Sequence, residues 1–189
     1  TGPRAIAAIA GERMRPRIRR SFERYRHGPG VFKVDFALAG PVALPDEDAV
    51  ANAAIPGLSG PRLVFVNGRY VPELSDSFAQ SGLEVTPLAE LCAAQGAPVP
   101  DILGELGDPG RHPFTALNLG LLEHGVVLRT TEGATPEAPV YLLFLSVPGT
   151  GPLACHPRIL IEAAARSSLT LVEHYAATER NENLANTVT

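Results

Sequence analysis

The stretch "GVVLRTTEGATPEAPVYLLFLSV", residues 125–147, decides the fold class of this chain. It contains two apolar runs rich in branched side chains, separated by a Gly- and Pro-containing turn at residues 133–139. Apolar runs of about four to eight residues bounded by turn residues are typical of buried strands. The longest, "VYLLFLSV" at 140–147, is far shorter than the roughly 18 apolar residues of a membrane span. The stretch therefore predicts two consecutive buried strands and no membrane segment.

Further strand patterns follow this stretch with no helical pattern between them. They are "RILIEAAA" (158–165), "SLTLVEHYAA" (168–177) and "LANTVT" (184–189). The lack of intervening helices argues against a doubly wound α/β fold. Short strands at such intervals are compatible with a sandwich, a barrel or a β-helix. The expected fold class is mainly β, with a small α/β N-terminal part.

The residues before this region predict a hairpin and two helices. "RLVFVNGRYVPELS" (62–75) reads as two strands joined at Asn67-Gly68, because both residue types tolerate the positive φ of a tight hairpin turn. "TPLAELCAAQG" (86–96) predicts a helix that begins near Pro87 and stops at Gly96. "FTALNLGLLEHG" (114–125) predicts a helix ending at Gly125, with an apolar face of Phe114, Leu117, Leu121 and Leu122.

Charge is unevenly distributed and predicts a division of the chain. Residues 1–41 hold nine basic and three acidic side chains, whereas the remainder holds seven basic and seventeen acidic ones. The expected segments are 1–42 (a basic helix plus a strand), 43–60 (a linker), 61–124 (the hairpin and helices) and 125–189 (the strands). The basic stretch has few aromatic residues, so it is interpreted as a solvated face or as one that contacts other parts of a parent protein. Neither nucleic acid nor membrane is an expected partner.

The pair Cys155-His156 is the one weak candidate for a metal site. Thiolate and imidazole are ligands of zinc and iron–sulfur centres, and Pro157 makes a turn plausible there. A complete site needs three or four ligands, and Cys92 has no neighbour at ligand spacing. The favoured role of the pair is structural. Two distant cysteines also argue against a disulfide framework and indicate a cytoplasmic protein.

Other polar residues do not assemble into a catalytic pattern. "EHY" at 173–175 lies in a predicted strand, which would place Glu173 and Tyr175 on one face and His174 on the other. No nucleophile elbow accompanies them. No catalytic residue is assigned, and the chain is not expected to be an enzyme.

Several polar residues receive structural interpretations instead. His124 is expected to end a helix and to complement its dipole, while His112, before Pro113, reads as loop. The acidic run Asp46 to Asp48 predicts a helix start. A polar ladder near the last strands is expected from Asn181, Asn183 and Asn186.

Residues from about 45 to 189 resemble the SufD family of iron–sulfur cluster assembly proteins. The phrases that carry this resemblance are "RLVFVNGRYVPELS", "FTALNLGLLEHGVVLRTTEGATPEAPVYLLFLS" and "HPRILIEAAARSSLTLVEHYAA". The resemblance implies a helical and hairpin subdomain followed by the first rungs of a right-handed parallel β-helix, truncated at the end of this chain. It also implies a cytoplasmic scaffold that acts by protein–protein interaction in a SufB–SufC–SufD complex of the SUF system.

The same resemblance sets expectations for partners and cofactors. SufB-like and SufC-like subunits are the expected partners, or else self-association through the open end of the β-helix. The cysteine and histidine that the family uses for cluster assembly belong to a later part of such proteins, so none is assigned here. A transient iron–sulfur cluster would be a property of the full complex.

Residues 4–42 resemble instead a fragment of a phytoene-desaturase-like FAD-dependent oxidoreductase, through "RYRHGPGVFKVDFALAGPV" at 24–42. "GPGVFK" begins like the G-x-G-x-x-G phosphate-binding turn, but Lys33 stands where the last glycine belongs. It also follows a helical pattern rather than a strand. FAD binding is therefore not expected. A fragment of a flavin oxidoreductase and a small metal-binding protein are the two alternative functions.

Overall fold

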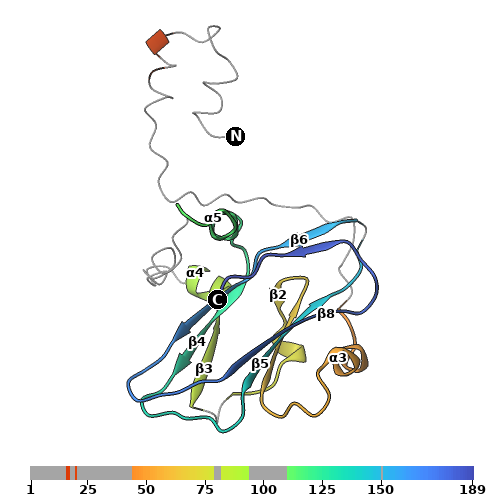
Figure 1. Cartoon of the computed structure of the whole chain (residues 1–189), viewed down its shortest axis with the longest axis vertical. Coiled ribbons are helices and arrows are strands. Elements are labelled where there is room, and N and C mark those ends of the chain that lie inside the picture. The colour runs from red at the N-terminus through yellow and green to blue at the C-terminus, as the bar shows by residue number, and fades with distance from the viewer. Residues whose placement is uncertain (1–15, 18–19, 21–43, 79–81, 94–109, 150) are drawn as a thin grey trace. The chain divides into compact units, whose positions relative to one another are not determined.

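The computed structural model describes residues 16–17, 20, 44–78, 82–93, 110–149 and 151–189 (Figure 1). The chain divides into two compact units, Thr1–Val31 and Phe32–Thr189. All of the elements below belong to the second unit. The predicted strand near residues 31–36 and the oxidoreductase-like "RYRHGPGVFKVDFALAGPV" lie outside the described residues, as does Gly96.

The described part of the chain is made mainly of short strands with a few short helices, which confirms the expected β-rich class. The helices are α3 (Glu47–Ala53), the 3₁₀ helix η2 (Pro72–Leu74), α4 (Leu88–Ala93) and α5 (Pro113–Gly120). The strands are β1 (Arg62–Val66), β2 (Arg69–Tyr70), β3 (Leu83–Pro87), β4 (Gly125–Thr130), β5 (Val140–Ser146), β6 (Leu153–Cys155), β7 (Arg158–Glu162), β8 (Leu171–Ala177) and β9 (Asn183–Ala185).

These strands form three sheets, and none of the sheets described closes into a barrel. The orders are β2-β1-β5-β8, β3-β4-β7 and β6-β9. The hairpin pair β1–β2 and the pair β3–β4 are antiparallel. The sheets are therefore mixed overall, whereas β1–β5 and every pair between two strands after residue 124 are parallel.

The parallel pairs after residue 124 join residues at similar sequence separations. Gly125 pairs with Arg158, Val140 with Leu171, and Leu153 with Asn183, so each pair joins residues 30 to 33 positions apart. An isolated parallel bridge between Arg158 and Val188 has the same spacing. The chain thus visits the three sheets in one order through β4, β5 and β6, and repeats that order through β7, β8 and β9.

The main core lies between the first two sheets. One side of β1 and β5 supplies fully buried Leu63, Phe65 and Leu142, and β4 and β7 supply Val126, Leu128 and Ile159. The opposite side of the first sheet packs against α3 through Val50, while α4 packs on the second sheet through Leu88 (Figure 1). Burial on both faces explains why β5 is apolar almost throughout.

The predicted hairpin is confirmed. Asn67 and Gly68 have φ angles of 50° and 82°, as a tight turn between right-twisted strands requires. The Asn67 amide also holds the end of β5: its Nδ2 donates to the Val147 carbonyl at 3.1 Å, and its Oδ1 accepts from the Val147 N–H at 2.9 Å. The turn therefore fixes a strand that follows it by about eighty residues.

The predicted helix over residues 114–125 is wrong in its end and in its buried face. α5 ends at Gly120, and Leu121 leaves helical geometry. Phe114 is 65% exposed and Leu117 is 39% exposed, whereas the fully buried residue of this helix is Asn118. The polar side chain is preferred at this contact because it pairs with backbone groups that would otherwise lack partners. Two strands, β3 and β6, had no predicted counterpart.

Candidate functional site

The outer strands of the three sheets leave one side of the strand stack unpaired within the described residues. β8, β7 and β9 are the last strands of their sheets, and Val188 bridges to Arg158 beside them. We call β8, β9 and residues 186–189 the open edge. An unpaired strand presents rows of backbone N–H and C=O groups, which makes it a template for another strand.

Side chains stack in columns toward the open edge. The strand register aligns Leu63, Leu142 and Glu173 in one column, and Phe65, Phe144 and Tyr175 in the next. The rings of Phe65 and Phe144 stack with centroids 4.7 Å apart, and those of Phe144 and Tyr175 repeat that spacing. Phe65 is fully buried, but Tyr175 is 47% exposed. The last ring of this aromatic column, that of Tyr175, is therefore about half exposed to solvent.

Polar atoms of the open edge form what we call the polar corner: Glu173, Tyr175 and Thr189. The Tyr175 hydroxyl donates to Glu173 Oε2 at 2.9 Å, and the Thr189 hydroxyl donates to Glu173 Oε1 at 2.6 Å. Burial raises the pKa of Tyr175 to about 12, with a smaller opposing effect from a hydrogen bond with Thr187. The phenol therefore stays protonated at neutral pH and remains a hydrogen-bond donor to the carboxylate.

His174 lies on the other face of β8, as its position in the strand predicts. Its Nδ1 is 2.6 Å from the Tyr141 hydroxyl, which accepts a hydrogen bond from the Ile55 N–H at 3.2 Å. The Tyr141 hydroxyl thus joins His174 to the backbone at Ile55. The "EHY" side chains are thus divided between two faces of the strand, so they cannot act as one catalytic group.

A buried polar node joins α5 to the last residues of the chain; it comprises Asn118, His156, Arg158 and Asn186. Asn118 Nδ2 donates to the carbonyls of Pro157 (2.9 Å) and Asn186 (2.7 Å), and Asn118 Oδ1 accepts from Arg158 Nε at 2.9 Å. Asn186 Nδ2 in turn donates to the Phe114 carbonyl at 2.8 Å and lies 3.2 Å from His156 Nδ1. This node fixes the final residues of the open edge against α5.

The predicted asparagine ladder forms only in part. Asn183 Nδ2 donates to Asn181 Oδ1 at 2.7 Å, and Ser146 bonds the same oxygen at 3.2 Å. Asn186 does not join them, because it belongs to the polar node. The three asparagines therefore do not form one continuous stack.

Cys155 and His156 occupy different surroundings, although they are adjacent. Cys155 ends β6 beside the Gly68 turn, where burial raises the pKa of its thiol and so disfavours the thiolate that a metal or an electrophile requires. His156 contacts Asn186, and burial lowers its pKa. The described residues contain no group of three or more His, Cys, Asp or Glu side chains able to hold a metal ion. The Cys92 side chain lies outside them.

Two further interpretations of polar residues have different outcomes. His124 follows α5 by four residues, so its predicted role at a helix end is wrong; its carbonyl instead accepts the Arg158 N–H at 3.0 Å where β4 meets β7. Asp46 is the N-cap of α3, with Oδ1 accepting the Ala49 N–H at 2.8 Å. Glu47 and Asp48 occupy the first turn, so the predicted helix start is confirmed.

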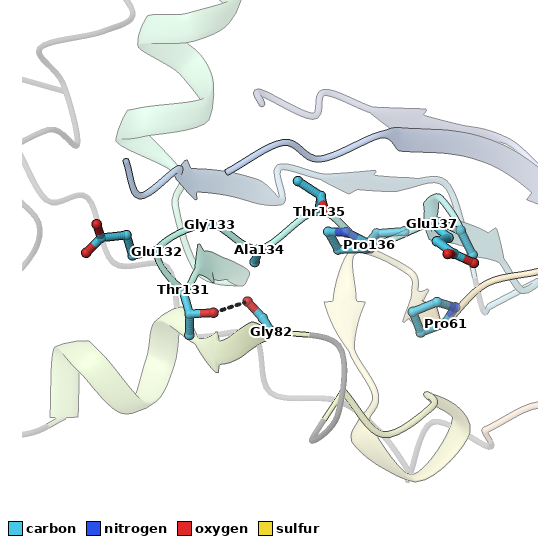
Figure 2. Close-up of a pocket in the computed structure, with 11 residues that line it drawn as sticks. Pro61, Gly82, Thr131, Glu132, Gly133, Ala134, Thr135, Pro136 and Glu137 are labelled. Atoms are coloured by element: carbon cyan, nitrogen blue, oxygen red, sulfur yellow. Dashed lines mark hydrogen bonds between the residues drawn. The ribbon is translucent and has the colours of Figure 1, made fainter. Parts of the chain in front are cut away.

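A surface hollow of about 510 Å³ lies at the β4–β5 connection, as shown in Figure 2. Backbone and small side chains of residues 131–138 line much of it, and the Thr131 hydroxyl closes one side by donating to the Gly82 carbonyl at 3.3 Å. Glu132 pairs with Arg166. The titratable residues that line the hollow are Glu132 and Glu137, and they form no cluster with a His, Cys or Asp of the described residues.

Comparison with known proteins shows which proteins this chain resembles in sequence. No protein-family profile matches the chain. An iron–sulfur cluster assembly SufBD family protein of Synechocystis is 32% identical over 149 residues, which cover 78% of this chain and 32% of that protein. The iron–sulfur cluster assembly protein SufD of Escherichia coli is 29% identical over 163 residues, covering 84% of this chain and 35% of that protein.

The aligned region of this chain is SufD-like in sequence. The chain spans about a third of the length of the curated relatives that it matches. In the SufD-like region described by the structure, no helix is both long enough and apolar enough to cross a membrane.

Proposed function

We propose that this SufD-like chain is a scaffold component of iron–sulfur cluster assembly that acts by binding other proteins rather than by catalysis. Its partners would be SufB-like and SufC-like subunits in the cytoplasm, and a cluster would be transient cargo of the whole complex. The observation that carries the proposal is the alignment of most of the chain with two proteins named for that process.

The proposal includes an architecture: the strands after residue 124 are the first rungs of a right-handed parallel β-helix. The common offset of 30 to 33 residues in the parallel pairs supports it, because each such step brings the chain back to the same sheet. The right-handed sense is expected since crossover connections between parallel strands are right-handed in about 98% of cases.

Co-elution tests the proposal. The tagged chain would be mixed with SufB-like and SufC-like subunits from its own source and passed through a sizing column with light-scattering detection. A complex that contains the wild-type chain together with these subunits is expected. A chain that stays monomeric in every mixture would contradict the proposal.

The same preparation separates the two alternative functions. After incubation with FAD and removal of the unbound FAD by desalting, an oxidoreductase fragment would retain flavin absorption, whereas an assembly scaffold would retain none. A small metalloprotein would lose its metal on Cys155→Ala. Equal metal content in wild type and variant would dismiss that alternative.

A further inference from the structure

The turn at Asn67-Gly68 is the only place in the sequence where an asparagine precedes a glycine. Glycine has no side chain to shield its backbone nitrogen, so an asparagine before it is chemically prone to lose its side-chain amide. The fold nevertheless requires this glycine. Gly68 has a φ of 82°, and a Cβ on it would lie 2.5 Å from the Cβ of Cys155. A reactive pair of residues is therefore fixed in place by the turn.

The side-chain amide of Asn67 is held by two hydrogen bonds to the backbone of Val147, which we call the clasp. Nδ2 donates to the Val147 carbonyl at 3.1 Å, and Oδ1 accepts from the Val147 N–H at 2.9 Å. Two bonds of opposite direction fix the plane of the amide. They also require an amide, because the carboxylate of an aspartate has no N–H to donate to a carbonyl.

Loss of the Asn67 amide proceeds by attack of the Gly68 backbone nitrogen on Asn67 Cγ. The new N–Cγ bond closes a five-membered succinimide ring, the Cγ–Nδ2 bond breaks, and Nδ2 leaves as ammonia with the proton of the Gly68 N–H. Water then opens the ring to aspartate or isoaspartate. In the folded chain Nδ2 is bonded to Val147 and the amide is not free to rotate toward the attacking nitrogen. The reaction therefore needs the clasp to open first.

We propose that Asn67-Gly68 is a deamidation site that the clasp protects, and that its modification irreversibly releases the end of β5. In the aspartate product a carboxylate oxygen replaces Nδ2 and faces the Val147 carbonyl, so two acceptors meet where a hydrogen bond was. In the isoaspartate product an extra backbone carbon enters the two-residue turn between β1 and β2. Both products loosen the start of the connection from β5 to β6. The inference does not depend on the proposed scaffold role.

Incubation of the full chain in mildly alkaline buffer, followed by peptide mass spectrometry, measures the reaction. The reference is the blocked peptide FVNGRYV, residues 65–71, in which nothing holds the amide. Asn67 in the folded chain is expected to deamidate more slowly than in the peptide by about tenfold or more, because both bonds of the clasp must open. In the chain unfolded by urea the two rates should agree. Asn52, which is exposed on α3 and precedes an alanine, gives the background rate.

Val147→Pro tests the clasp itself, because it removes the N–H that Asn67 Oδ1 accepts. Val147 follows the last residue of β5, so the strand's own residues are unchanged. Deamidation of the folded variant should be about tenfold faster than that of the wild type. Gly149→Ala, in the same segment, is the matched control, since nothing lies within 4 Å of its Cβ, and it should react like the wild type.

Circular dichroism establishes that each variant is folded. If Val147→Pro does not fold, wild-type chain in urea below its unfolding transition replaces it. Deamidation of Asn67 and hydrogen exchange of the Val147 N–H should then accelerate in parallel, because both report opening of the clasp.

Asn67→Asp reproduces the aspartate product directly. It should lower the urea midpoint of unfolding, whereas Asn52→Asp makes the same charge change on an exposed residue of α3 and should leave the midpoint unchanged. Equal midpoints for the two variants would show that modification does not release β5.

Three other results would overturn the inference. They are a folded-chain rate equal to that of the peptide, no reaction of Asn67 even in urea, and equal rates in Val147→Pro and Gly149→Ala. Acceleration only at urea concentrations that unfold the whole chain would also overturn it, because the protection would then come from the fold as a whole and not from the clasp.

Discussion

Asn118 and Asn186 are in direct contact although they are 68 residues apart in sequence: Asn118 Nδ2 donates to the Asn186 carbonyl at 2.7 Å. The same amide also bonds the Pro157 carbonyl and Arg158 Nε. One fully buried side chain on α5 thus holds two segments of the strand stack that come after it. The position of residues 186–189 depends on this contact.

Removing the Asn118 side chain should lower the free energy of unfolding. Asn118→Ala removes a donor from the Asn186 carbonyl and the acceptor of the Arg158 Nε–H, while the Pro157 carbonyl keeps the Val188 N–H at 3.3 Å. Each buried group left unsatisfied costs about 1–3 kcal/mol. We expect a loss of about 3 kcal/mol in the free energy of unfolding, measured by urea titration. The exposed control Asn52→Ala should change it by less than about 0.5 kcal/mol. Equal effects in the two variants would show that the contact is not structural.

Gly125 is predicted to tolerate no side chain. A Cβ at this position would lie 2.1 Å from the Arg158 carbonyl oxygen on the paired strand β7. Gly125→Ala should therefore separate β4 from β7 and lower the unfolding free energy by about 3 kcal/mol or more. Gly120→Ala is the matched control, because nothing lies within 4 Å of its Cβ. That variant should unfold within about 1 kcal/mol of the wild type.

Stability should fall as the solution becomes acidic, in part through His124. Burial lowers the pKa of His124 from 6.5. The unfolded chain therefore binds this proton more readily, and the stabilising contribution present above pH 6.5 is lost as the pH falls below it. Urea unfolding measured from pH 8 to pH 5 should show a shallower decline for His124→Gln. Parallel pH profiles for the two proteins would contradict this prediction.

Deprotonation of Tyr175 should account for part of the loss of stability at alkaline pH. Its pKa is raised to about 12 in the folded chain, above the ordinary value of 10.0. The stability that the protonated phenol contributes is fully present below pH 10 and is lost as the pH rises toward 12. Ultraviolet titration of tyrosinate should show a late component that disappears in Tyr175→Phe. An unchanged late component in the variant would assign it to another tyrosine.

The sequence alone predicts those features of the fold that depend on neighbouring residues. The Asn67-Gly68 turn follows from the backbone freedom of two residues. The start of α3 follows from the capping side chain of Asp46. The long strands β5 and β8 follow from apolar runs between turn residues, and the alternation of strand side chains placed His174 opposite Glu173 and Tyr175.

Features that depend on distant partners were not predictable in the same way. β6 is three residues long and carries no pattern of its own; it is a strand because β9 pairs with it. Asn118 sits among leucines in a stretch that reads as an apolar helix face, and only its bonds to residues 39 to 68 positions away explain its burial. The columns that end at Glu173 and Tyr175 become visible only when the register between strands is known.

Hydrogen exchange on the chain alone and in a mixture with the SufB-like and SufC-like subunits tests the central claim most directly. If this SufD-like chain is a scaffold that binds those subunits, a set of its amides should exchange more slowly in the mixture than in the chain alone. Identical exchange of all amides in the two samples would contradict the account.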